Sequence, residues 1–214
     1  MKYSLKVGFM IVAILALNTS SVFSQFSFGL KGGFSAVNVL VKDKKEGFDY
    51  SSYYKWKPSY HIGFKADYSL SKRSFIIGEF IFSDKGSNVN NDNLHLYYIH
   101  IPIMYRFEVG NKISVEIGSD FGILLSSKYK YPVEDEYRKT DLGIGAGAAY
   151  NITDELSVSI RFTRSISSVL RKDFGVTFYS GDGFYMGSFN LYENGIRYYN
   201  QSVQLSMNYR LKKI

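Results

Sequence analysis

Two of the three histidines, His61 and His100, fall among the polar positions of segments that alternate polar and apolar residues. Serines and carboxylates occupy comparable positions. In nucleophilic catalysis a histidine takes a proton from serine and a carboxylate orients the histidine, so these residue types permit a Ser–His–carboxylate site. The candidates are Ser114, Ser157, Ser159, Glu79, Glu116, Asp120 and Asp141. One hypothesis is therefore an enzyme that uses a serine nucleophile.

The surrounding sequence favours a structural role for these groups. It contains no G-x-S-x-G, H-E-x-x-H or P-loop motif. The absence of cysteine excludes thiol catalysis, Cys-ligated metal and disulfides. Charged groups in an enclosed interior must neutralise one another, which requires the same residue types. We predict no catalytic, cofactor or metal site, and instead a buried polar network of His61, Glu79, His100, Arg106, Glu116, Asp120, Asp141, Arg161 and Arg210.

The composition indicates strands and turns. The 214 residues include 19 Tyr, 17 Phe and 19 Gly but only 3 Pro, and 45% are hydrophobic. The formal net charge is +7, and no basic–aromatic motif predicts a nucleic-acid partner.

The first residues have the three-part pattern of a secretory signal. Lys2 and Lys6 precede an apolar run from Val7 to Leu17, which is too short to span a bilayer as a helix. We predict a signal peptide over residues 1–24 and one domain over 25–214.

After residue 25 the apolar residues recur with a period of two, which indicates strands. Eight such segments occur, at 26–36, 59–70, 74–83, 94–109, 113–123, 141–150, 156–163 and 202–211. Short connections (71–73, 110–112, 151–155) alternate with long ones (39–58, 84–93, 126–140, 167–200). This plan predicts an all-β fold, an eight-stranded antiparallel up-and-down transmembrane β-barrel in the outer membrane.

Four tyrosines repeat at hairpin spacing. Each begins a Tyr-x-apolar triplet beside a short connection or the C-terminus, on the apolar face: Tyr68, Tyr105, Tyr150 and Tyr209. They predict an aromatic belt at the periplasmic membrane surface.

The alternation also suits a soluble lipocalin-like barrel with its apolar face inside. The polar face, however, is rich in small residues such as Gly143, Gly145 and Gly147, whereas the apolar face carries bulky residues. Small residues suit a crowded lumen, so we expect the apolar face to contact lipid. Eight strands leave room for side chains rather than a water channel, and we expect a plugged lumen.

Three segments resemble a known family. Ser83-Asp84-Lys85-Gly86, Tyr98-Ile99-His100-Ile101-Pro102-Ile103-Met104-Tyr105 and Asp141-Leu142-Gly143-Ile144-Gly145-Ala146-Gly147 resemble the outer-membrane β-barrel domain family of Bacteroidota, with porin-like and PorT-like members. His100 stands where that family usually has Glu. The resemblance implies an outer-membrane location and, in one branch, a component of a type IX secretion apparatus.

The long connections are where a variable function would lie. Residues 176–179 and 184–186 flank a Gly-rich turn and predict a hairpin that extends the last two strands. The favoured hypothesis is a structural or loop-mediated binding protein, with outer-membrane lipid and a protein as partners. The alternatives are an accessory subunit of a type IX-like secretion apparatus and a lipid-modifying enzyme with its site in the lumen.

Overall fold

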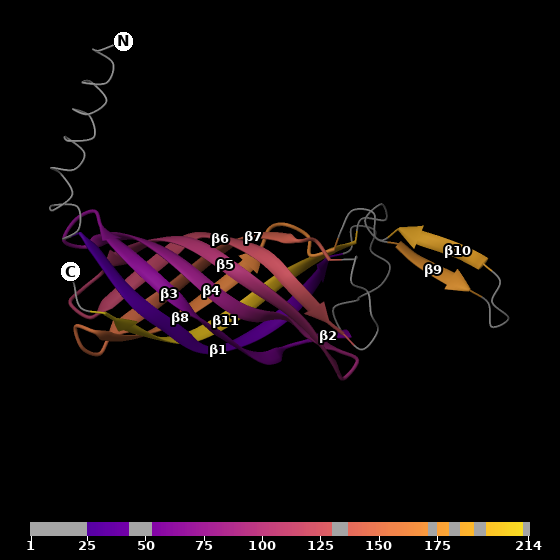
Figure 1. Cartoon of the computed structure of the whole chain (residues 1–214), viewed down its shortest axis with the longest axis horizontal. Helices are drawn as coiled ribbons and strands as arrows, with labels where there is room; N and C mark the ends of the chain where they lie inside the picture. Colours follow the sequence, from indigo (N-terminus) through magenta and orange to yellow (C-terminus); the bar gives the residue numbers. More distant parts are fainter. Residues whose placement is uncertain are drawn as a thin grey trace, which may run out of the picture.

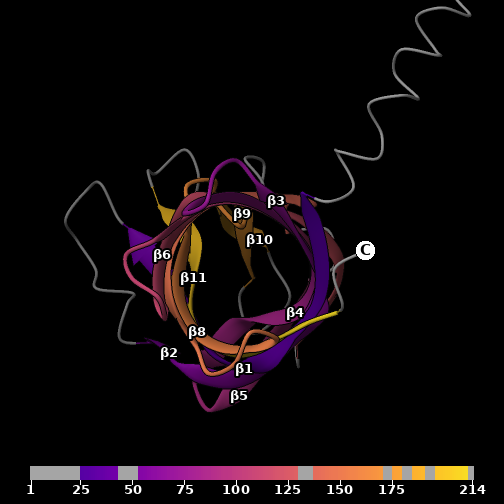
Figure 2. The ribbon, with the colours of Figure 1, turned by 90° about the vertical axis from the view of Figure 1, so that its left-hand side faces the viewer.

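Eight antiparallel strands close into a barrel in the computed structural model, which describes residues 25–42, 53–129, 137–170, 175–179, 185–190 and 196–211. Neighbours in sequence pair around the wall, and β1 pairs with β11 to close it (Figures 1 and 2). The strands are β1 (Phe26–Lys42), β3 (Lys57–Ser69), β4 (Ser74–Val89), β5 (Asp92–Glu108), β6 (Ile113–Lys128), β7 (Thr140–Asn151), β8 (Leu156–Ser165) and β11 (Arg197–Arg210). The predicted fold class is confirmed; the predicted signal peptide lies outside the described residues.

The three short connections share one geometry. In each, the same backbone bond closes the turn: Leu70 donates to Ser74, Val109 to Ile113, and Ile152 to Leu156, at 2.9–3.0 Å. Figure 1 shows these turns at the barrel end where the chain enters β1 and leaves β11. The described part of the chain contains no helix long and apolar enough to span a membrane.

The connection predicted as a long loop at 84–93 is instead the continuation of β4 and β5. The two strands stay paired up to Val89 and Asp92. Asn90 and Asn91 make the turn with φ of 49° and 69°. Positive φ at both central residues is the geometry of a tight hairpin turn, and Asn tolerates it. The prediction was wrong because it did not recognise the pair Asn90-Asn91 as a tight turn.

Three further strands lie at the opposite end, which we predict to be extracellular because the longer connections lie there and outer-membrane barrels have short periplasmic turns. β2 (Tyr54–Lys55) pairs with the end of β4, and β9 (Gly175–Tyr179) pairs with β10 (Tyr185–Asn190). The predicted hairpin therefore forms, although its turn lies outside the described residues. It makes a separate two-stranded sheet. The expectation that this hairpin would lengthen β8 and β11 was therefore wrong.

The barrel wall exposes its apolar side chains and buries its polar ones. Phe34 is 76% exposed and Ile117 63%, whereas Lys31 and Arg161 are each 2% exposed. A soluble barrel has the reverse arrangement. An apolar exterior of this extent is favourable only against hydrocarbon, and closure leaves no unpaired strand edge within it. The expectation that the apolar face contacts lipid is therefore supported over a soluble barrel.

Pro102 lies on the inward side of β5 and interrupts its pairing with β4. Regular pairing covers Gly78 with Ile103 and Ile81 with His100, but not the residues between them. Proline has no amide hydrogen to donate, which explains the gap. The register is the same on both sides, so the interruption is not a bulge. The nearby register shift lies on the other edge of β5, at Tyr97 and Tyr98 against β6.

Candidate functional site

A chain of ion pairs crosses the periplasmic half of the lumen. Arg161 of β8 is its centre: Nη1 and Nη2 donate to the two carboxylate oxygens of Glu79 at 2.6 and 2.8 Å, and Nε donates to Glu116 Oε1 at 2.7 Å. Lys31 Nζ approaches the same Glu79 at 3.0 Å. We call the full set the lower network: Lys31, Lys65, Asp67, Glu79, Arg106, Glu116 and Arg161.

The lower network continues from Glu116 to the opposite wall. Arg106 lies 3.6 Å from Glu116 and 3.5 Å from Asp67, and Asp67 is 3.1 Å from Lys65. These groups come from six strands. A charge removed from water is tolerated only with close opposite charges and hydrogen bonds. The bidentate Arg161–Glu79 pair meets that need with the planar geometry that suits arginine.

A second set, the upper network, lies nearer the extracellular end and consists of Lys85, His100, Asp120, Asp141 and Asn200. Lys85 Nζ is 3.5 Å from both Asp120 and Asp141. His100 Nδ1 is 3.0 Å from Asp120 Oδ1, and Asn200 Nδ2 donates to Asp141 Oδ2 at 3.1 Å. Across the two networks, five Lys and Arg face five Asp and Glu, so the lumen is close to electrically neutral.

His61 lies outside both networks. Its Nδ1 is 2.8 Å from Ser35 Oγ and its Nε2 is 2.8 Å from Ser206 Oγ. The hydrogen-bond partners of the two central histidines, His61 and His100, therefore differ. His61 has serines on both ring nitrogens and no carboxylate bonded to it, whereas His100 has a carboxylate and no serine bonded to it. Among the described residues, neither histidine is part of a Ser–His–carboxylate relay.

The structure joins most of the predicted polar network. Glu79, Arg106, Glu116 and Arg161 meet in the lower network, and His100, Asp120 and Asp141 in the upper one. Arg210 is half-buried at the periplasmic end of β11, and the structure shows no ion pair between its side chain and the others. The prediction did not name Lys31, Lys65, Asp67 and Lys85. The first three lie on polar faces of alternating segments, whereas Lys85 fell in the supposed loop.

Little space remains between the two networks. The cavity there has a volume of about 10 Å³ and is lined by His100, Asp120 and Arg161 together with Met104 and Gln204. Such a volume admits about one water molecule. Nε2 of His100 has no hydrogen-bond partner within the described part of the chain, and a water here would provide one. The described residues contain no cluster of three His, Asp or Glu that would hold a metal ion.

An apolar cluster lies inside the barrel near its predicted extracellular end. We call it the cap: Val39, Leu94, Leu96, Tyr98, Val169, Ile196 and Tyr198, with Tyr54 packed against it. The Tyr54 and Tyr198 rings meet edge to face with centroids 5.7 Å apart. Burial raises the pKa of the Tyr54 phenol, which lies on β2 beyond the membrane-spanning segments, above its usual range.

The cap was not predicted, although the sequence contains a signal for it. Along β1 the inward positions are Lys31, Gly33 and Ser35, and then Val37 and Val39. The apolar residues therefore change from the outward to the inward face near residue 36. The same change occurs in β5 and β11. Within the membrane the outward face of a strand must be apolar because it contacts lipid. Beyond the membrane the outward face contacts water, and the apolar residues turn inward. The position of this change therefore marks the membrane boundary.

A lysine replaces missing backbone pairing in the wall between β3 and β4. Their regular pairing stops at His61 and Ser83. Above that point Lys57 Nζ lies 3.0 Å from both oxygens of Asp84 and donates to the carbonyls of Lys85 and Leu94 at 3.1 and 3.0 Å. His95 Nδ1 lies 2.8 Å from the same Asp84. The ammonium thus ties three strands together where the ladder is open.

The four predicted belt tyrosines all lie on the outward face near the short turns. Tyr105, Tyr150 and Tyr209 are 41–51% exposed, and Tyr68 is half-buried with its ring centroid 4.9 Å from that of Phe26. Lys112 lies over the Tyr150 ring at 5.9 Å. An amphipathic ring beside a cation fits the membrane–water boundary. The positions of the four tyrosines agree with the predicted belt, which stays a prediction.

The chain is similar to small outer-membrane barrels of known structure. Among solved structures, Ail of Yersinia pestis, crystallised with the heparin analogue sucrose octasulfate, is 14% identical with a TM-score of 0.48, over 87% of this chain and 99% of its own. Neisserial surface protein A is 9% identical with a TM-score of 0.48, over 86% and 97%. No curated protein matches the sequence.

A family model settles the assignment. The model described as outer membrane protein beta-barrel domain matches residues 18–171, which is most of the chain. It agrees with the closed eight-stranded wall and its lipid-facing exterior. The chain therefore belongs to the outer membrane protein beta-barrel domain family and is a protein of the outer membrane.

Proposed function

We propose that this protein is a sealed barrel that acts through its extracellular end, where its loops bind a partner. The observation that carries the proposal is the closure of the lumen at three successive levels. Side chains from opposite sides of the barrel are bonded to one another in the lower and upper networks and pack together in the cap. A route for solutes would require breaking ion pairs whose members are almost completely buried.

The extracellular end is the part of the molecule left for recognition. The β4–β5 hairpin continues to Val89 and Asp92, and β9 and β10 form a sheet of their own at the same end of the barrel (Figure 1). A transmembrane strand needs about 9–11 residues, whereas β1 and β5 have 17 each. The barrel thus extends its strands beyond the membrane at this end, and connections carried on such a scaffold are the usual place for a binding surface. The Ile101-Pro102 element supports placing the protein among the porin-like barrels of Bacteroidota.

The sealed lumen predicts an absence of steady conductance. Purified protein inserted in a planar lipid bilayer should give no ohmic current above the unmodified bilayer, because the interior of an eight-stranded barrel has room for side chains rather than for a water channel. The positive control is a general porin added to the same bilayer. A reproducible unitary conductance from the wild-type barrel would refute the plug and favour a channel.

Site-specific crosslinking tests which end meets the partner. A photo-crosslinking amino acid replaces Thr177 of β9 in one variant and Asn111 of a periplasmic turn in another, in intact cells. We expect discrete adducts from position 177 and none from position 111, because β9 lies at the end where we propose that the partner binds, whereas Asn111 lies in a short turn at the other end. Adducts confined to position 111 would contradict this proposal and favour an accessory subunit that contacts a periplasmic apparatus.

A further inference from the structure

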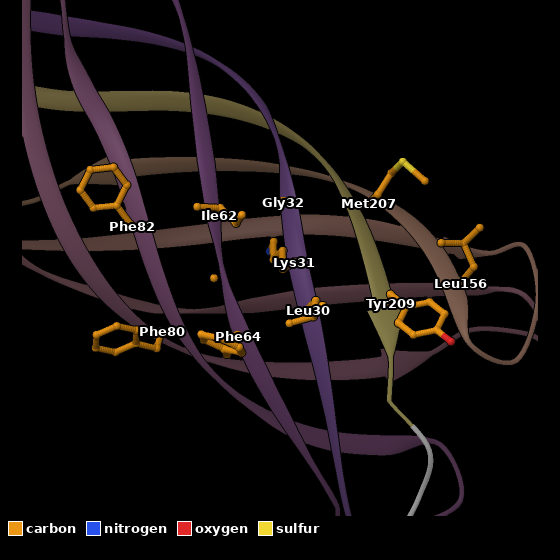
Figure 3. Close-up of a pocket in the computed structure, with 11 residues that line it drawn as sticks. Leu30, Lys31, Gly32, Ile62, Phe64, Phe80, Phe82, Leu156, Met207 and Tyr209 are labelled. Atoms are coloured by element: carbon orange, nitrogen blue, oxygen red, sulfur yellow. The ribbon is translucent and has the colours of Figure 1, made fainter.

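A groove crosses the outer wall of the barrel on the side of β1. Its volume is about 670 Å³, within the ~300–1,000 Å³ of small-ligand sites. Figure 3 shows it passing from β4 over β3 and β1 to β11 and the start of β8. The side chains along it are apolar apart from the Tyr209 hydroxyl, since Lys31 turns its ammonium to Glu79 inside the lumen. They are Leu30, Ile62, Phe64, Phe80, Phe82, Leu156, Met207 and Tyr209.

The groove exists because an outward position of β1 has no side chain. Gly32 lies between Leu30 and Phe34 on the outward face and is paired with Ile62 on β3 and Met207 on β11. A Cβ at Gly32 would meet its nearest atoms at 3.6 and 3.7 Å, which is ordinary contact. The backbone therefore does not require glycine here, and the effect of Gly32 is to leave space among bulky neighbours.

We propose that this groove binds an acyl chain of a phospholipid from the periplasmic leaflet. The groove is continuous with the lipid-facing wall, where hydrocarbon is the solvent. It is elongated, and its lining offers dispersion contacts rather than polar partners. One end lies at Leu156, the first residue after the periplasmic turn, and beside Tyr209 of the predicted belt. A chain lying in the groove thus has its headgroup at the periplasmic membrane surface.

A flexible chain fits the groove better than a second copy of the barrel does. In a two-fold contact the same surface of each copy meets, so the two concave grooves would face each other and leave a void. The rim residues Ile62 and Phe64 are 61% and 63% exposed and would hold the copies apart. This inference is independent of the function proposed for the extracellular end.

Gly32→Leu, which fills the groove, is the test, and Gly78→Leu is its matched control. Gly78 lies on the outward side of β4, paired with Ile103 and outside the groove, and a Cβ there meets nothing within 4 Å. Both variants add the same side chain to the lipid-facing wall. Heat-modifiability on a gel establishes that each one folds.

Native mass spectrometry measures retention of palmitoyl-oleoyl phosphatidylethanolamine through detergent exchange. Wild type and Gly78→Leu should each keep one phospholipid. The fraction of Gly32→Leu that retains a phospholipid should be at least about tenfold lower than that of wild type, the equivalent of about 1.4 kcal/mol in binding free energy. Equal retention by all three proteins would overturn the proposal. So would a wild-type dimer that Gly32→Leu converts to a monomer, which would assign the groove to self-association.

Discussion

Replacing Arg161 by methionine should lower the free energy of unfolding by about 3–5 kcal/mol, the range for removing one partner of a buried ion pair. Arg161 holds Glu79 and Glu116 through bonds of 2.6–2.8 Å, and each of these side chains is at most 2% exposed. Methionine fills similar space but leaves both carboxylates short of positive charge; Lys31 alone remains on Glu79. Urea unfolding in phospholipid vesicles, followed by circular dichroism, measures the change.

The control for Arg161→Met is Arg164→Met, three residues along the same strand. Arg164 is half-buried on the outward side of β8, so its loss should change the free energy of unfolding by less than about 1 kcal/mol. Adding Glu79→Gln to Arg161→Met should recover part of the loss, since it removes one uncompensated charge. If Arg161→Met and Arg164→Met unfold at the same urea concentration, the lower network does not stabilise the barrel.

Replacing Gly33 by alanine should cost about 3 kcal/mol or more, the upper part of the range for steric overpacking. A Cβ at Gly33 would lie 2.0 Å from the carbonyl oxygen of Leu205 and 2.8 Å from the Cα of Ser206. Both atoms belong to the backbone of β11, which cannot rotate away as a side chain can. β1 and β11 would have to separate at the pairing that closes the barrel.

The neighbouring Gly32→Ala is a matched control for Gly33→Ala. Its Cβ would meet nothing closer than 3.6 Å, so its stability should stay within about 0.5 kcal/mol of wild type. The fraction folded after transfer from urea into vesicles, read by gel mobility without boiling, gives the comparison. Similar folded fractions for the two alanine variants would show that the close approach at Gly33 is not constraining.

The strands, the short turns and the lipid-facing side of the wall were predictable because they depend on local patterns. Side chains alternate along any strand, so the row Phe28, Leu30 and Phe34 determines one face without knowledge of its neighbours. The direction of that face followed from the small residues opposite. The extent of β4 and β5 was missed because the two-residue turn at Asn90 and Asn91 carries a weaker signal than glycine.

The partners inside the lumen were decided by the tertiary structure. Alternation shows that Lys31, Glu79 and Arg161 turn inward, but not that they meet. Lys31 and Glu79 are 48 residues apart, and Glu79 and Arg161 are 82 apart. Their heights in the lumen depend on strand stagger, which is a property of the closed barrel rather than of any one strand. For the same reason only the pairing of β1 with β11 distinguishes Gly33, which must be glycine, from Gly32, which leaves a groove.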